Sequence, residues 1–337
     1  MKSDGYSLST LVHKFNSRRV VFCGSDEIAL PMLEYLNQLQ AISLTGVLTQ
    51  PDRRSGRGRK LKANSIKEWA SQNSVEVRTP EKPTRNEIEW LKEIDADLVL
   101  VMAYGHILSQ EFLDCTPWGC FNLHASLLPK YRGASPIETA LANGDFETGV
   151  TLMRMVRKMD AGPLVGQEVV QITSEDTGTS LRKKLADSCV PLIQKYLNNL
   201  LSGTAAELPQ MENEVTYCRK LKKEDAHLNF SLGAKFLECR VRAFKAWPGS
   251  IFIYNETPLK IGSAKALPDQ GLSPGQIEVK SNDVRVGTGD GILQIFELQK
   301  PGGKMLPVAD FIRGFTFDNN VQVKFAENQP LVSKNFH

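Results

Sequence analysis

The sequence has few of the residue patterns that build metal sites and disulfide frameworks. Its six cysteines are scattered over 337 residues without a C-x-x-C pair, and none of its five histidines lies four residues from another. Structural zinc sites and small disulfide-rich domains depend on such closely spaced ligands or cysteine pairs. We therefore expect a protein without a metal, with reduced cysteines, in a reducing compartment such as the cytoplasm.

Several other patterns are missing as well. No apolar run approaches the roughly 18–20 residues that span a bilayer, so we expect no membrane segment. The formal net charge of +3 is too small to indicate a nucleic-acid partner by itself. The first apolar run is followed by a single glycine, Gly24, where a dinucleotide-binding protein would carry G-x-G-x-x-G. This absence removes the main reason to expect NAD chemistry.

Residues 1–18 are basic and poor in acids, with Asp4 as the only carboxylate. They contain no continuous apolar segment, so a secretory signal is not expected. A short basic extension is the simpler interpretation. A mitochondrial transit peptide is the alternative.

Apolar runs and helical patterns alternate from residue 19 to residue 201, which is typical of an α/β protein with a parallel sheet. Strands are predicted at residues 19–24, 42–48, 75–78, 97–102, 119–124, 149–155 and 164–172. Helices are predicted at residues 28–39, 65–72, 87–92, 137–142 and 177–201. We expect a Rossmann-like domain over residues 19–203.

A different pattern follows residues 204–214, which contain Pro209, show no clear period and are predicted to be a linker. The region 215–330 opens with a basic patch of Arg219, Lys220, Lys222 and Lys223. A helix at 232–244 and short strands at 250–254, 259–264, 275–279, 284–288 and 293–298 follow, with a last helix at 308–313. Short alternating strands separated by turns predict a small antiparallel barrel of the OB type.

A cationic stretch lies between the second strand and the second helix. Residues 51–62 contain six basic side chains and two glycines, which predicts a mobile loop. Such runs are often only solvated charge. The position after a parallel strand favours a phosphate-binding arm, because loops at that edge surround the binding crevice of open α/β sheets. The candidate side chains are Arg53, Arg57, Arg59 and Lys60.

The stretch 119–136 contains the most suggestive polar residues. Asn122 and His124 share one face of a predicted strand, since strand side chains alternate with period two. An amide can donate to an oxyanion, and an imidazole can exchange a proton near neutral pH. Asp160, in a turn between two strands, is the best carboxylate to join them, with Asp145 and Asp26 as competitors. A core Asn–His pair that satisfies itself is the alternative.

The same stretch resembles a known family. Asn122-x-His124, then Ser126-Leu127-Leu128-Pro129 and Arg132-Gly133, is similar to the signature of the 10-formyltetrahydrofolate-dependent formyltransferases. Residues 50–53, 242–249 and 287–293 resemble the branch that acts on methionyl initiator tRNA. The resemblance covers residues 19–316, both domains and the linker.

The resemblance implies transfer of a formyl group from 10-formyltetrahydrofolate to the α-amine of methionine on initiator tRNA. It implies that Asn122 and His124 stabilise the oxyanion while Asp160 orients His124 and assists proton movement. The folate-contacting loop of the family matches Ser126, Leu127, Leu128 and Pro129, and residues 102–108 would wall the pterin. The basic stretch and the C-terminal barrel would bind tRNA, and we expect a monomer.

One segment departs from the family pattern. The family usually carries Asp-x-Gly-x-Asp-Thr-Gly around the catalytic carboxylate, whereas Val156, Lys158 and Ala161 occupy three of these places here. Lys158 is expected to lie close enough to Asp160 to keep it ionised.

Three other functions remain open. A sugar-nucleotide formyltransferase would share the N-terminal chemistry but has less need of the cationic stretch. A formyltetrahydrofolate hydrolase would use the same three residues with water as the acceptor, and usually carries an N-terminal regulatory domain that we do not expect here. A non-catalytic RNA-binding module would use none of them.

Overall fold

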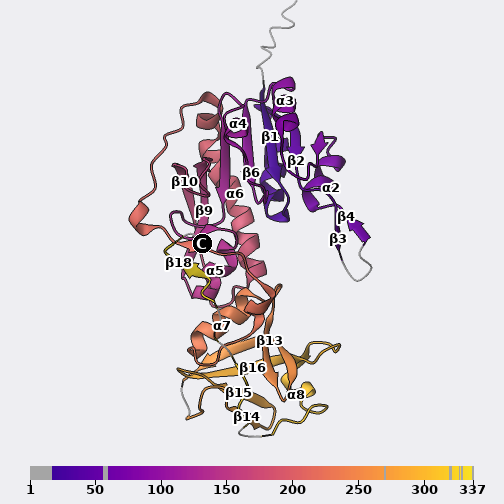
Figure 1. Ribbon diagram of the computed structural model, residues 1–337, viewed down its shortest axis with the longest axis vertical. Helices are drawn as coiled ribbons and strands as arrows, with labels where there is room; N and C mark the ends of the chain where they lie inside the picture. The colour runs from indigo at the N-terminus through magenta and orange to yellow at the C-terminus, as the bar shows by residue number, and fades with distance from the viewer. Residues whose placement is uncertain are drawn as a thin grey trace, which may run out of the picture. The chain divides into compact units, whose positions relative to one another are not determined.

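The computed structural model describes residues 17–55, 60–268, 271–318, 321–325, 327 and 329–335 (Figure 1). Two compact units make up the chain. One runs to Phe121 and includes Leu197–Ala205, and the other comprises Asn122–Tyr196 and the chain from Ala206 onward.

Seven strands are hydrogen-bonded in the order β10-β9-β7-β6-β1-β2-β5. Their bounds are β1 Arg18–Gly24, β2 Ile42–Leu48, β5 Val77–Arg78, β6 Leu98–Met102, β7 Cys120–His124, β9 Glu147–Arg154 and β10 Leu164–Gln171. Strand β1 is parallel to β2 and β6, β2 is parallel to β5, and β10 is antiparallel to β9. The predicted mostly parallel α/β sheet is confirmed.

The helices of the first unit mostly begin at capping side chains. They are η1 Glu27–Ala29, α1 Leu30–Asn37, α2 Ser65–Gln72, α3 Arg85–Glu93 and α4 Gln110–Leu113. Four of them follow a side chain that accepts a hydrogen bond from a backbone N–H without a partner inside the helix. These side chains are Asp26, Asn64, Thr84 and Ser109. Only α4 has no counterpart in the sequence prediction, because four residues carry no helical period.

The single glycine after the first strand has a packing role. A Cβ at Gly24 would lie 2.5 Å from the Met102 carbonyl oxygen, so a side chain there would push β1 away from β6. Gly24 therefore allows the ends of β1 and β6 to lie close together, and we assign it no role in binding a dinucleotide.

The basic stretch differs from its prediction. The sequence predicts a mobile loop here, whereas strands β3 Arg53–Ser55 and β4 Lys60–Lys62 pair antiparallel. Two short runs separated by a glycine-containing stretch are a hairpin signal that the concentration of charge concealed. Arg57 and Arg59 fall outside the described residues.

The second unit contains a small sheet built from three distant parts of the chain. Strand β11 Tyr217–Cys218 lies between β8 Arg132–Gly133, to which it is parallel, and β18 Val332–Ser333, to which it is antiparallel. Helix α5 Pro136–Asn143 follows β8, and α6 Gly178–Ser202 follows β10. Within the described residues, no helix is long and apolar enough to cross a membrane.

The C-terminal part of this unit is an antiparallel β domain, as predicted. Its elements are η2 Glu212–Glu214, η3 Lys223–Ala226, α7 Ala234–Ala243, β12 Ser250–Tyr254, β13 Thr257–Leu267, β14 Ile277–Lys280, β15 Asp283–Gly287, β16 Ile292–Gln299, β17 Leu306–Pro307 and α8 Val308–Phe311. The strand order is β12-β13-β16-β15-β14, with β17 beside β16. Isolated bridges from Lys324 to Ile253 and from Gln322 to Gln276 tie one segment to both ends of this order. Buried side chains such as Phe230, Phe252 and Leu298 form its core.

The segment predicted to be a linker is bonded to its surroundings. Leu208 forms a bridge with Leu164 at the start of β10. The Glu207 carboxylate pairs with Arg154, with a shortest N–O distance of 2.6 Å. Residues 206–214 are therefore part of the second unit rather than a free connection.

Candidate active site

Strand β7 ends in the two polar side chains that the sequence singles out. The His124 side chain is 7% exposed, and its Nε2 lies 2.9 Å from the Tyr131 carbonyl oxygen. A carbonyl oxygen can only accept, so Nε2 carries a proton in this arrangement. Asn122 is partly exposed, and none of the described residues hydrogen-bonds its side chain.

Asp160 lies against His124. Its Oδ1 is 3.7 Å from His124 Nδ1, and its Oδ2 accepts the backbone N–H of Gly133 at 2.8 Å. The competing carboxylates have other partners, since Asp145 accepts the Tyr131 hydroxyl at 2.6 Å and Asp26 caps η1. The structure thus brings together the pair that the sequence favours.

The hydrogen bonds decide what each group can do. Because Nε2 of His124 donates to a backbone carbonyl, Nδ1 is the nitrogen that can gain or lose a proton, and it faces the Asp160 carboxylate. The Asn122 amide keeps its N–H donors available. The site offers a proton acceptor beside a carboxylate, and a donor two residues earlier on the same strand.

The turn that carries Asp160 has an unusual backbone. Asp160 has φ of +48°, and a Cβ at Gly162 would lie 1.8 Å from the Arg154 carbonyl oxygen. Only glycine fits at that close approach. The Lys158 ammonium lies 3.6 Å from Glu212 Oε2 and forms no ion pair with Asp160 in the described structure, so the influence of Lys158 on Asp160 stays a prediction. Glu212 is the carboxylate that the exposed lysine reaches.

The loop after β7 is closed by its own hydrogen bonds. Ser126 is fully buried and its hydroxyl donates to the Lys130 carbonyl at 2.7 Å, while the Leu128 N–H donates to Thr151 Oγ1 at 3.0 Å. Ser126 and Leu128 therefore hold the loop in shape. Leu127 and Pro129 are partly exposed and are the members of this motif that remain able to contact a ligand.

The loop after β6, in the first unit, holds two buried polar atoms without partners. Tyr104 Oη and His106 Nε2 have no hydrogen-bond partner among the described residues, and their rings meet edge to face at 4.9 Å between centroids. Burial lowers the pKa of His106, and the Arg53 charge lowers it further. Buried groups of this kind fit a polar ligand that would satisfy them.

The two basic segments differ in how far their charges are neutralised. Arg53 pairs with Glu81 at 2.9 Å, with both side chains largely exposed, and Lys60 on β4 is exposed. Arg219 is mostly buried and forms two hydrogen bonds with Asp225, at 2.8 and 2.6 Å. The Arg219 guanidinium therefore supports the fold locally.

One site residue gives no sequence signal. Gln210, in the predicted linker, donates to the backbone carbonyls of Asp160 and Gly162 at 2.8 and 2.7 Å. A glutamine in a segment without periodicity has no feature that assigns it to a distant turn.

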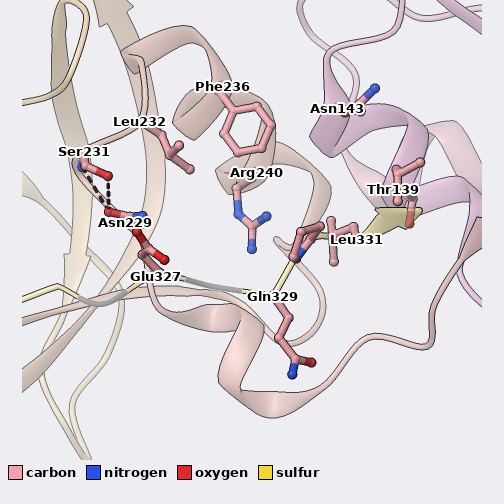
Figure 2. Close-up of a pocket in the computed structure, with 12 residues that line it drawn as sticks. Thr139, Asn143, Asn229, Ser231, Leu232, Phe236, Arg240, Glu327, Gln329 and Leu331 are labelled. Carbon is pink, nitrogen blue, oxygen red and sulfur yellow. Dashed lines mark hydrogen bonds between the residues drawn. The ribbon is translucent and has the colours of Figure 1, made fainter. Parts of the chain in front are cut away.

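A separate cavity of about 400 Å³ lies within the second unit, between α5, α7 and the C-terminal segment (Figure 2). The Arg240 guanidinium points into it and packs 4.9 Å from the Phe244 ring centroid. Burial lowers the pKa of Arg240 to about 10. None of the residues predicted to form the site lines this cavity. In the part of the chain that the structure describes, no cluster of three His, Cys, Asp or Glu side chains is arranged to hold a metal ion.

Solved structures with this fold include formyltransferases. An N-formyltransferase from Helicobacter canadensis, in complex with folinic acid and dTDP-3-aminofucose, superposes with a TM-score of 0.63 at 22% identity, over 84% of this chain and 99% of that chain. HypX from Aquifex aeolicus, in complex with tetrahydrofolic acid, has a TM-score of 0.58 at 17% identity, over 92% of this chain and 51% of that chain. At these identities the likeness establishes the fold alone.

Sequence relatives are closer. A methionyl-tRNA formyltransferase of Paraburkholderia phymatum is 40% identical over 92% of this chain and 98% of its own length. A methionyl-tRNA formyltransferase of Thermotoga neapolitana is 36% identical over 91% of this chain and 98% of its own length. Residues 18–195 match the formyl transferase family, and residues 220–316 match the formyl transferase C-terminal domain. The chain therefore belongs to the formyl transferase family, with methionyl-tRNA formyltransferases as relatives over nearly its full length.

Proposed function

We propose that the protein transfers the formyl group of 10-formyltetrahydrofolate to the α-amine of methionyl initiator tRNA, for translation initiation. The observation that carries this is the His124–Asp160 pair beside an Asn122 amide that is free to donate. Identities of 36–40% to methionyl-tRNA formyltransferases support the choice of acceptor.

The amine must lose a proton as it attacks the formyl carbon, so a base is needed near it. His124 Nδ1 takes this proton, and the Asp160 carboxylate 3.7 Å away stabilises the imidazolium that results. The Tyr131 carbonyl keeps the ring oriented through Nε2. The proton then passes to the folate nitrogen as the carbon–nitrogen bond to the formyl group breaks.

The formyl oxygen becomes anionic when the tetrahedral intermediate forms, and it needs a donor aimed at it. Asn122 supplies that donor, because His124 Nε2 donates to the Tyr131 carbonyl and Nδ1 is the unprotonated nitrogen that accepts the proton of the amine. The family resemblance implies that Asn122 and His124 both stabilise the oxyanion, whereas we assign this role to Asn122 alone.

The folate cosubstrate is expected to contact Leu127 and Pro129, with Ser126 and Leu128 holding the loop. Tyr104 Oη and His106 Nε2 supply unpartnered polar atoms that a pterin can satisfy. Tyr104→Phe should therefore raise the KM for folate without changing the KM for tRNA.

The tRNA is expected to contact the hairpin through Arg53 and Lys60, and through Arg57 and Arg59, which lie outside the described residues. Exposed Lys220, Lys222 and Lys223 offer a second set of charges for phosphates.

A single assay tests this function against the alternatives. The protein is incubated with 10-formyltetrahydrofolate and either methionyl-tRNA, an amino-sugar nucleotide or buffer, and formyl transfer is followed. We expect transfer to methionyl-tRNA only. Transfer to the sugar nucleotide, release of formate in buffer, or tRNA binding without any transfer would each identify one of the other functions.

We also propose three domain segments, 19–203, 204–214 and 215–330. The family matches that end at residue 195 and begin again at residue 220 support this division. Limited proteolysis should cut first near Gly203 and Thr204, which are exposed and precede the bonded residues 206–214.

We propose a monomer in the cytoplasm. Six free thiols support a reducing compartment. A mitochondrial location is the alternative if residues 1–18 act as a transit peptide. Light scattering and the location of a full-length fluorescent fusion test the two statements.

A further inference from the structure

One side chain of the segment 206–214 hydrogen-bonds the backbone of the turn that carries Asp160. Gln210 Nε2 donates to the Asp160 carbonyl at 2.8 Å and to the Gly162 carbonyl at 2.7 Å. Asp160 has φ of +48°, a region that non-glycine residues adopt at a cost. A turn in this conformation depends on such contacts to keep one geometry.

Gln210 is itself fixed by a buried arginine. Nε and Nη2 of Arg132 donate to Gln210 Oε1 at 3.0 and 2.8 Å, and the Arg132 side chain is fully buried. The guanidinium can only donate and the two carbonyls can only accept, so the amide has one possible orientation. Arg132 Nη2 also donates to Glu212 Oε1 at 3.0 Å, which provides the countercharge.

The neighbours of Arg132 hold the reacting side chains themselves. The Tyr131 carbonyl accepts from His124 Nε2, and the Gly133 N–H donates to Asp160 Oδ2. Three consecutive residues thus fix the histidine ring, the carboxylate and, through Gln210, the backbone beneath that carboxylate.

We propose that Gln210, held by Arg132, is a positioning residue that sets the distance between Asp160 Oδ1 and His124 Nδ1. The inference rests on the proposed catalytic roles of His124 and Asp160. It gives Gln210, in the segment between the two family domains, a role in the active site that requires no contact with a substrate.

The substitution Gln210→Glu separates positioning from folding. The glutamate keeps an oxygen for Arg132 and adds an ion pair to it, but it has no N–H for the two carbonyls. We expect a modest fall in melting temperature, because the new carboxylate faces two carbonyl oxygens that lose their donor. The kcat should fall about ten- to hundredfold, since misplacement by about 1 Å can cost about a hundredfold. The KM values for folate and methionyl-tRNA should not change. A purely structural role would move the melting temperature and leave kcat intact.

Glu207→Gln is the matched control. Glu207 belongs to the same segment and pairs with Arg154, but it makes no hydrogen bond to the Asp160 turn within the described residues. Its loss should lower the melting temperature slightly and leave kcat near the wild-type value. Equal losses of kcat in the two variants, or a wild-type kcat in Gln210→Glu, would overturn the proposal.

A double-mutant cycle with Asp160→Asn shows which idea fails. If Gln210 acts through Asp160, the Gln210→Glu change should cost little in the Asp160→Asn background. Losses that multiply instead would overturn the positioning role. Full activity of Asp160→Asn alone would overturn the proposed catalytic role, whereas an inactive Asp160→Asn with a fully active Gln210→Glu would overturn only the positioning.

Discussion

The Tyr131 carbonyl oxygen determines which nitrogen of His124 can take part in proton transfer. It accepts from His124 Nε2 at 2.9 Å and from Cys218 Sγ at 3.4 Å. Burial raises the pKa of Cys218 to about 12, so its thiol keeps the proton that it donates. With Nε2 bonded to this carbonyl, Nδ1 is the nitrogen left for proton transfer, and Asn122 is the proposed donor to the formyl oxygen.

The first prediction concerns that donor. Asn122→Ala should lower kcat by about 10²–10³, the usual cost of removing one oxyanion donor. Asn122→Asp, which keeps the size of the side chain but has no N–H, should lose as much. Melting temperatures should stay at the wild-type value, because no described residue hydrogen-bonds this side chain. A kcat near that of the wild type in the aspartate variant would contradict the assignment.

At the residue scale, the sequence predicts which side chains form the site better than it predicts their protonation or the residues that hold them in place. Period-two alternation is enough to place Asn122 and His124 on one strand face. The hydrogen-bonded nitrogen of His124 depends on Tyr131, seven residues away and beyond a turn. Gln210 reaches Asp160 across 50 residues, and no local pattern records such a contact.

At the scale of elements, the start of α6 depends on one buried carboxylate. Asp176, 4% exposed on its side chain, accepts from Lys184 at 2.6 Å and from the N–H of Thr173 at 2.7 Å. Burial alone would raise its pKa, but the bonds from Lys184, Thr173 and Ser180 bring the pKa down to about 2.

Because the pKa of Asp176 is lower in the folded state, its charge stabilises the folded protein at pH values above the unfolded-state pKa of about 4. This contribution is lost as the pH falls towards 2. Asp176→Asn should therefore unfold about 2 kcal/mol more easily at pH 7, and the difference from the wild type should shrink between pH 4 and pH 2. Urea unfolding across this range measures it. Glu175→Gln, at the exposed neighbouring position, is the control and should show no such pH dependence. A difference that stays constant with pH would contradict the prediction.

A third prediction concerns the pairing of β8 with β11. Gly133 has φ of +126°, and a Cβ there would lie 2.2 Å from the Cys218 carbonyl oxygen. Gly133→Ala should cost about 1–3 kcal/mol of stability, and kcat should also fall because the Gly133 N–H holds Asp160. Gly314→Ala meets no described atom within 4 Å and should melt like the wild type. Equal melting temperatures in the two variants would rule out this account.

Elements with a complete apolar pattern were predictable, whereas short strands that depend on distant partners were not. The strand over residues 42–48 and the helix over residues 65–72 were predicted with their observed bounds, because each contains a complete apolar pattern. Strands β8, β11 and β18 have two residues each and exist only through partners that are distant along the chain. The sheet that they form includes Gly133, whose N–H bonds the Asp160 carboxylate. The strands that lie beside the candidate site were therefore the hardest to predict from the sequence.

At the scale of the whole molecule, the modest net charge of +3 conceals an uneven distribution. Arg219 is engaged with Asp225, so its removal should destabilise the second unit rather than weaken tRNA binding specifically. Lys60 is exposed on β4, beside the cationic residues of the same hairpin. A substitution in the hairpin therefore tests phosphate contacts with less effect on the fold than a substitution of Arg219.

If Lys60 contacts a phosphate, Lys60→Ala should weaken methionyl-tRNA binding and flatten the plot of log Kd against log salt by about one unit of slope, because one fewer counterion is released. The KM for folate should not change. Lys300→Ala, at an exposed lysine of the C-terminal domain, is the control and should keep the wild-type slope. Filter binding of methionyl-tRNA at several salt concentrations gives both slopes. If Lys60→Ala and Lys300→Ala flatten the plot equally, the hairpin has no special role and the protein attracts tRNA only by its general positive charge.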